Sequence, residues 1–320
     1  MYEAIKNFSK QFSYQPEIQN SEKLSRYTWY IVCGMGGSHL AADILKIYNP
    51  KLPLIIHKNY GLPEVPEEIL SNSLVIISSY SGNTEEAIDS YQKAKEKNIP
   101  LAAISVGGKL IEMAKEDGIP YIILPNTGIQ PRSALGFSLK ALMALMCQEN
   151  GLSEISSLSD IVPASIEEKG KKLAEDISNM VPMIYSSEAN YPIAYNWKIK
   201  FNETGKIPAF CNVFPELNHN EMTGFDFNEK TKKMSESFCF IMLQDKLDHP
   251  KIKKRMDVTS KLLENKGLKV IKIELEGKDV LHKIFSSLLL ADFAAYYTAK
   301  MNGAESEQVP MVEEFKKLII

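Results

Sequence analysis

The sequence predicts an α/β protein of two domains, each built on a doubly wound, mainly parallel sheet flanked by helices. The chain has 320 residues, which is more than a single hydrophobic core usually organises. From residue 27 onward, short apolar runs alternate with longer amphipathic stretches, as in β-α-β units. The apolar runs are continuous, which is typical of strands that are covered by helices on both faces.

Five apolar runs and three helical stretches make up the first half of the chain. The runs are YTWYIVC, PLIIH, SLVIISSY, LAAISV and YIILP, and the helical stretches are 38–47, 84–97 and 132–149. A serine-rich segment, GLSEISSLSDIVP, follows Asn150 and is typical of a linker. We therefore expect a first domain over residues 1–152 and a second over residues 153–320.

The second half begins with a charged helical run at 165–179 and then repeats the alternation. We expect strands at YPIAY, FCFIMLQ and LKVIKIEL, helices at 250–265 and 280–302, and an irregular stretch up to Phe225. The last segment, VEEFKKLII, has the pattern of a short amphipathic helix with Lys316 and Lys317 on or near its polar side.

Composition excludes several classes of protein. A net charge of -3 and a pI near 6.1 give no broad positive field for nucleic acid. The most apolar segment, 284–301, contains Asp292 and Lys300, so we expect a buried helix and no membrane span. The N-terminus lacks the pattern of a secretory signal, and the four cysteines form no C-x-x-C pair, so we expect no zinc cluster, no disulfide framework and a cytoplasmic location.

The first motif with chemical meaning is Gly34-Met35-Gly36-Gly37-Ser38, between a predicted strand and a predicted helix. Glycines at Gly36 and Gly37 let the backbone approach a ligand, and the helix N-terminus beyond them attracts an anion. A dinucleotide site is disfavoured, because His39 replaces the third glycine and no acidic residue ends the next strand. A tight turn that serves packing alone stays open as an alternative.

The second motif is SSYSGNTEE at residues 78–86, again where a strand gives way to a helix. Several hydroxyls, backbone N–H groups and a helix N-terminus converge there, which suits a phosphate monoester. The motif lacks the Gly-Lys-Ser/Thr of a nucleotide-binding loop, so it implies no magnesium chemistry. The alternative is that Ser81 or Asn83 merely caps the helix.

The third motif, PRSALG at residues 131–136, begins another helix after a strand, where open α/β sheets bind ligands. A fixed guanidinium at Arg132 would stabilise negative charge on an enediolate oxygen. The alternative is a surface arginine with a solvated head group.

These three motifs together resemble the sugar isomerase (SIS) domain. Asn202-Glu203-Thr204 and PELNHNE at residues 215–221 are similar to the bifunctional phosphoglucose/phosphomannose isomerases, and the resemblance spans about residues 25–320. It implies two SIS domains and a homodimer whose active sites are shared between subunits. We expect sugar phosphate substrates, and neither a cofactor nor a metal. The phosphate would be held by Ser38, Ser79, Ser81 and Thr84.

The resemblance also implies the catalytic residues. Arg132 would face the enediolate, Glu203 would be the base, and His219 of the neighbouring subunit would open the sugar ring. A C-terminal lysine would assist near the ring oxygen, and of the adjacent Lys316 and Lys317 we expect Lys316.

Elementary chemistry agrees with these roles. Interconversion of an aldose and a 2-ketose moves one proton between C1 and C2, which a single carboxylate can remove and return. Ring opening near neutral pH suits a histidine. We therefore expect an enzyme that interconverts glucose 6-phosphate, and also mannose 6-phosphate, with fructose 6-phosphate.

Two alternatives remain. One is an isomerase of another phosphosugar. The other is a non-catalytic phosphosugar sensor, although the residues before Tyr27 are too few and too little basic for a helix-turn-helix.

Overall fold

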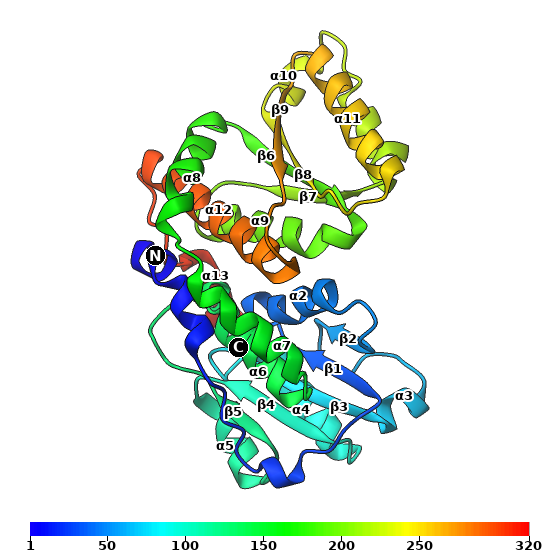
Figure 1. Ribbon diagram of the computed structural model, residues 1–320, viewed down its shortest axis with the longest axis vertical. Coiled ribbons are helices and arrows are strands. Elements are labelled where there is room, and N and C mark those ends of the chain that lie inside the picture. Colours follow the sequence, from blue (N-terminus) through cyan, green and yellow to red (C-terminus); the bar gives the residue numbers. More distant parts are fainter. Residues whose placement is uncertain (320) are drawn as a thin grey trace. The chain divides into compact units, whose positions relative to one another are not determined.

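The computed structural model describes residues 1–319, and the chain divides into two compact units (Figure 1). The N-terminal unit comprises Lys6–Ile161. The C-terminal unit comprises the chain from Val162 onward together with Met1–Ile5. Each unit has its own parallel sheet, so the predicted fold class is confirmed.

The division lies after residue 161, whereas the sequence analysis placed it after residue 152. The serine-rich segment is not a linker, because it forms α7 (Glu149–Ser156) and a 3-10 helix (Ser157–Asp160). Ile155 and Leu158 are fully buried, and α7 packs against α6 (Leu135–Leu145). This packing keeps the segment in the N-terminal unit.

The N-terminal sheet has the order β2-β1-β3-β4-β5, and every neighbouring pair is parallel. Its strands are β1 (Trp29–Cys33), β2 (Leu54–His57), β3 (Ser73–Ser78), β4 (Leu101–Ser105) and β5 (Tyr121–Ile123). Ile31 and Val75 pack on one face with residues of α4 and α5, while Val32 and Ile76, which point to the other face, are equally buried. Burial on both faces explains the continuous apolar runs in the sequence.

Helices connect these strands as crossovers. Besides α6 and α7, the unit contains α2 (Leu40–Tyr48), α3 (Glu67–Ser71), α4 (Glu85–Glu96) and α5 (Gly108–Glu116); the short α1 (Tyr2–Lys6) begins the chain. On α4 the buried Ala87, Tyr91 and Ala94 share one face at helical spacing, and this face covers the sheet.

The C-terminal sheet repeats the same strand order without a fifth strand. Its order is β7-β6-β8-β9, again parallel throughout. The strands are β6 (Val181–Ser187), β7 (Phe210–Phe214), β8 (Phe238–Gln244) and β9 (Lys269–Glu274). The helices are α8 (Ala164–Asp176), α9 (Tyr191–Glu203), α10 (Lys232–Ser235), α11 (Pro250–Asn265), α12 (Val280–Met301) and α13 (Pro310–Leu318).

Two predictions for this half were wrong. YPIAY is the first part of α9 and not a strand; its Pro192 occupies the first turn, where the missing N–H costs a helix nothing. The strand before it is VPMIYSS, and the stretch expected to be irregular contains β7. The predicted strands at FCFIMLQ and LKVIKIEL and the C-terminal helix are confirmed.

Buried polar contacts join α9 to α12. The indole N–H of Trp197 donates to Ser287 at 2.9 Å, and the Lys200 ammonium lies 2.6 Å from the Asp292 carboxylate. Both side chains of this ion pair are buried. The contacts hold α9 in a defined position along α12.

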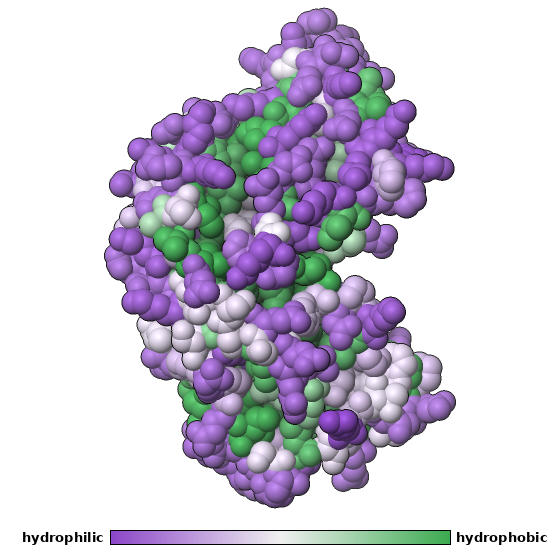
Figure 2. Space-filling view, in the orientation of Figure 1, coloured by the Kyte–Doolittle hydropathy of each residue, from purple (hydrophilic) through white to green (hydrophobic). Residues whose placement is uncertain are grey.

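Hydrophilic side chains cover most of the face of the molecule drawn in Figure 2. Among residues 1–319, no helix combines the length and the hydrophobicity that crossing a membrane would need.

Candidate active site

The predicted phosphate-binding residues gather at one edge of the N-terminal sheet. Parallel strands end at the same edge, so the loops that follow β1, β3 and β4 meet there. The GMGGS turn follows β1, and SYSGNT follows β3. Arg132 lies in a 3-10 helix, Pro131–Ser133, between β5 and α6.

Direct contacts join the first two loops. The Ser78 hydroxyl donates to the carbonyl oxygen of Ser38 at 2.8 Å, and the Ser38 hydroxyl accepts the backbone N–H of Tyr80 at 2.9 Å. A Cβ on Gly34 would lie 2.7 Å from the carbonyl oxygen of Ser78, so only glycine fits this approach. Ser38 is thereby buried beside the second loop.

The hydroxyls of the second loop turn toward one another. Ser79 Oγ lies 2.8 Å from Thr84 Oγ1, and it also accepts the N–H of Gly82 at 3.1 Å. Thr84 stands at the N-cap of α4, but among the described residues its side chain makes no capping hydrogen bond. Ser81 accepts the N–H of Asn83, and Asn83 accepts that of Lys109, so neither caps α4. The capping interpretation of this motif is therefore wrong.

A third loop, which the sequence analysis missed, supports the second. Gly82 has φ +73°, and a Cβ there would lie 1.8 Å from the carbonyl oxygen of Gly107. A Cβ on Gly108 would lie 2.6 Å from the carbonyl oxygen of Ser81. The signal was present in the sequence as two consecutive glycines directly after a strand.

Arg132 is held against the first loop. A Cβ on Gly37 would lie 2.7 Å from the backbone nitrogen of Arg132, and Gly36 has φ +51°. The Arg132 side chain is only 2% exposed, so the alternative of a solvated surface arginine is wrong. A buried guanidinium at the carboxyl edge of a parallel sheet is suited to a charged ligand.

Glu203 is the last residue of α9 in the C-terminal unit. A helix that follows a parallel strand runs back toward the amino edge of the sheet, so Glu203 lies near that edge, shortly before β7 begins. The Lys200–Asp292 ion pair fixes the preceding turn. The ammonium of Lys206 donates to the backbone carbonyl of Glu203 at 2.6 Å.

His219 follows β7 and therefore lies at the opposite, carboxyl edge of the same sheet. It is exposed, and β7 is an edge strand. Glu221 steadies this loop by accepting hydrogen bonds from Tyr185 and, at 2.5 Å, from Asn212. Burial, together with the bond to Glu221, raises the pKa of the Tyr185 phenol, which keeps it a donor.

The structure does not bring Glu203 and His219 of one chain together. The length of β7, five residues, separates the two edges of the sheet by about 16 Å. Lys316 lies on the exposed α13, where it pairs with Glu313 at 2.8 Å.

The carboxyl edge of the C-terminal sheet is charged where the N-terminal one carries hydroxyls. Lys283 donates to Asp245, and Asn190 donates to Asp245 at 3.2 Å and to Asp248 at 3.3 Å. All four side chains are buried. Burial raises the pKa of Asp245, but hydrogen bonds, above all from Lys283, outweigh it and lower that pKa below its ordinary value. Burial, with the nearby Asp245 carboxylate, raises the pKa of Asp248.

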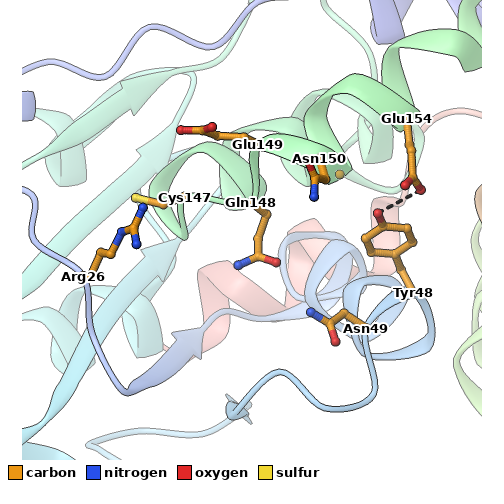
Figure 3. A pocket seen from close by; sticks show the side chains of 9 residues that line it. Arg26, Tyr48, Asn49, Cys147, Gln148, Glu149, Asn150 and Glu154 are labelled. Carbon is orange, nitrogen blue, oxygen red and sulfur yellow. Dashed lines mark hydrogen bonds between the residues drawn. The ribbon is translucent and has the colours of Figure 1, made fainter.

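A polar hollow of about 530 Å³ lies at the amino edge of the N-terminal sheet, away from the SYSGNT loop. Figure 3 shows its lining side chains, including Arg26 ahead of β1, Asn49 after α2, and Tyr48, whose hydroxyl donates to Glu154 at 2.8 Å. Among residues 1–319, no group of three or more His, Cys, Asp or Glu side chains is arranged to hold a metal ion.

Comparison with known proteins identifies the family. Residues 166–319 match the model of the bacterial phospho-glucose isomerase C-terminal SIS domain. Bifunctional phosphoglucose/phosphomannose isomerases of Caldicellulosiruptor bescii and Aquifex aeolicus are 34% and 32% identical to this chain, over 99% of it and 98% and 97% of their own lengths. The chain belongs to the bifunctional phosphoglucose/phosphomannose isomerase family. The family that the motifs of the sequence indicated is thereby confirmed.

A solved structure supports the same fold. The glucosamine-6-phosphate deaminase of Thermotoga maritima superposes with a TM-score of 0.71 over 97% of both chains, at 16% identity. At this identity the likeness concerns the fold alone.

Proposed function

We propose that this chain is a metal-independent aldose-ketose isomerase that interconverts glucose 6-phosphate and mannose 6-phosphate with fructose 6-phosphate. The observation that carries the proposal is the carboxyl edge of the N-terminal sheet. There, three interlocked loops present hydroxyls and a helix N-terminus beside a buried arginine, in a chain whose relatives carry this activity in their names.

The sugar phosphate is held by its phosphate group. Ser38, Ser79, Ser81 and Thr84 supply hydroxyls, and the first turn of α4 supplies N–H groups and the positive end of a helix dipole. At Gly36 a Cβ would meet no atom within 4 Å, so the backbone there is open to a ligand, whereas Gly37 packs against Arg132. Neutral donors of this kind bind phosphate as a handle and leave the sugar carbons to other groups.

Glu203 removes the proton from C2 of the aldose and returns it to C1, so that the reaction passes through a cis-enediolate. One carboxylate suffices, because the two carbons are adjacent and the proton stays on one face. Arg132 stabilises the negative charge that develops on the enediolate oxygen; its burial strengthens this interaction. Lys316 assists near the ring oxygen.

We further propose a homodimer in which His219 is supplied by the neighbouring subunit and opens the sugar ring. The placement of Glu203 and His219 at opposite edges of one sheet supports this, because a single chain would have to span about 16 Å between them. The exposure of His219 beyond an edge strand leaves it accessible to another subunit.

Activity toward both aldoses follows from the intermediate. Glucose 6-phosphate and mannose 6-phosphate differ only in configuration at C2, which is lost in the enediolate. The product aldose depends on which face of C2 receives the proton. A site that lets the bound chain rotate about the C2–C3 bond serves both epimers, and such an enzyme would act on sugar phosphates in the cytoplasm.

A coupled assay tests the proposal. The formation of fructose 6-phosphate is measured from glucose 6-phosphate and, separately, from mannose 6-phosphate, after treatment with EDTA. Turnover of both substrates is expected. Turnover of glucose 6-phosphate alone would restrict the function to phosphoglucose isomerase. Inactivity toward both would refute the proposal and favour another phosphosugar or a sensor.

A further inference from the structure

The C-terminal end of α9, which carries Glu203, is held by several backbone hydrogen bonds. The N–H groups of Thr204 and Gly205 both donate to the carbonyl of Lys200, and Ile207 donates to Phe201 at 3.2 Å. The helix therefore ends in turns wider than an α-helical turn; the i→i+5 bond also ends α4, α5 and α11, whereas the bond from Ile207 spans six residues. A Cβ on Gly205 would lie 2.7 Å from the carbonyl oxygen of Phe201, so glycine is required there.

Lys206 follows in the left-handed conformation at φ +56°, where helices usually carry glycine. From this position its ammonium reaches two backbone carbonyls. One belongs to Glu203, at 2.6 Å, and the other belongs to Gln308, more than a hundred residues later in the chain. A non-glycine residue persists in this conformation when the surrounding structure holds it there.

Gln308 belongs to the segment that leads from α12 into α13. This segment is itself tightly organised: the Glu305 carboxylate accepts the N–H groups of Glu307 at 2.7 Å and Gln308 at 2.6 Å. Burial raises the pKa of Glu305, but these hydrogen bonds and the positive charge of Lys206 lower it overall. Lys206 thus joins the turn that carries Glu203 to an ordered segment that leads to Lys316 on α13.

We propose that Lys206 is a positioning residue. It fixes Glu203 relative to the segment that precedes α13, so that Glu203 and Lys316 reach the same substrate. This inference rests on the proposed function, since it concerns the catalytic base, Glu203, and the C-terminal lysine, Lys316, of that reaction. Lys206 touches backbone carbonyls and acts through other residues. The loops proposed to bind the phosphate belong to the N-terminal unit. We therefore expect Lys206 to affect the chemical step and not the binding of the phosphate.

Kinetics of three variants test the proposal in the full-length protein. Lys206→Asn keeps a residue that tolerates the left-handed conformation but cannot reach either carbonyl. It should lower kcat by about tenfold to a hundredfold, as expected when a base is displaced by about 1 Å, while KM changes less than threefold. Lys206→Arg, whose guanidinium can donate to both carbonyls, should restore most of kcat.

The matched control is Lys253→Met. Lys253 also donates from its ammonium to a backbone carbonyl, that of Lys246 at 3.0 Å, in the same unit but on α11. This variant should keep the kcat of the wild type. Wild-type kcat in Lys206→Asn, or an equal loss in Lys253→Met, would overturn the proposal. So would a loss in Lys206→Asn that appears only in KM.

Hydrogen exchange separates this proposal from the proposed function, because it does not depend on activity. Amides of residues 304–318 should exchange at least about tenfold faster in Lys206→Asn than in the wild type or in Lys253→Met. Unchanged exchange would overturn the role of Lys206 even if the enzyme is an isomerase. Faster exchange in a protein whose wild type turns over no sugar phosphate would refute the proposed function and retain the structural link.

Discussion

The buried ion pair between Lys200 and Asp292 allows a quantitative prediction for the C-terminal unit. The ammonium and carboxylate lie 2.6 Å apart, and their side chains are 2% and 5% exposed. Lys200→Met keeps the length of the side chain but leaves the buried carboxylate without its ammonium. Removing one partner of such a pair costs about 3–5 kcal/mol of unfolding free energy, because the remaining charge stays desolvated.

Urea denaturation, followed by tryptophan fluorescence, measures this loss of unfolding free energy in the C-terminal unit. The chain has two tryptophans: Trp29 in β1 of the N-terminal unit and Trp197, which is fully buried in α9 one turn before Lys200. In a Trp29→Phe background, the fluorescence reports Trp197 and therefore the C-terminal unit. The urea midpoint of its transition should fall markedly on Lys200→Met, with an unchanged slope.

A surface pair provides the matched control. Lys172 and Asp176 lie at the same distance, 2.6 Å, on α8, but their side chains are 68% and 36% exposed. Lys172→Met should cost only about 0.3–0.5 kcal/mol. The double variant Lys200→Met, Asp292→Leu should recover most of the stability, since it removes the orphaned charge. A loss below about 1 kcal/mol in Lys200→Met, or no recovery in the double variant, would refute the reasoning.

Four further predictions concern the proposed site and the C-terminal unit. Glu203→Gln should lower kcat by at least about a thousandfold and leave sugar phosphate binding by calorimetry intact, and near-normal turnover would remove Glu203 as the base. Inactive Glu203→Gln chains mixed with inactive His219→Ala chains, with subunit exchange confirmed, should regain part of the activity if the active site is shared between subunits. No recovery of activity would count against a shared site. Gly82→Ala should cost about 2 kcal/mol or more of unfolding free energy and weaken sugar phosphate binding, because of its φ of +73° and the carbonyl of Gly107; wild-type binding would contradict the role of this turn. Because the pKa of Asp248 is raised on folding, by burial and by Asp245, the folded chain binds more protons than the unfolded chain from about pH 4 upward, and stability falls as the pH rises through this window. Asp248→Asn should therefore gain stability relative to the wild type between pH 3.5 and pH 7 in thermal unfolding, and a difference that is constant with pH would contradict the shift.

The sequence predicts the N-terminal unit better than the C-terminal unit for a physical reason. The strands at Trp29–Cys33 and Ser73–Ser78 are buried on both faces, so their apolar runs are continuous and end in glycine and serine. In the C-terminal unit, VPMIYSS begins with a valine and a proline and ends in serines, while the next segment, YPIAY, has the composition of a strand. Local composition does not show which of these two segments is the strand. YPIAY becomes helical because α9 packs on α12.

The candidate site shows the same limit. Hydroxyls and glycines next to each other in the sequence predict the loop at Ser79–Thr84, because that loop is a local feature. The support from Gly107, the burial of Arg132 and the reach of Lys206 to Gln308 depend on contacts between distant segments. Such contacts leave no periodic signal in the sequence, so they appear only once the fold is known.

The two units share one strand order but carry different side chains at the carboxyl edges of their sheets. In strand order, β1 and β3 correspond to β6 and β8, so SYSGNT and the segment around Asp245 occupy equivalent places. The N-terminal place carries neutral hydroxyls and uncharged loops, which leave room for the charge of a phosphate. The C-terminal place contains two aspartates and a lysine that already neutralise one another in part, so a phosphate there would meet carboxylates.

This internal pairing explains why the chemistry of the C-terminal unit would lie elsewhere. Lys283, Asp245 and Asp248 occupy the carboxyl edge of the C-terminal sheet. Glu203 lies instead near the amino edge, at the end of α9. There Lys206 connects it to the segment that precedes α13. His219 stays at the carboxyl edge, beyond the reach of Glu203 in the same chain. If the proposed reaction uses both residues at one sugar, the amino edge of one C-terminal sheet would have to meet the carboxyl edge of another, an arrangement that a symmetric dimer would form twice.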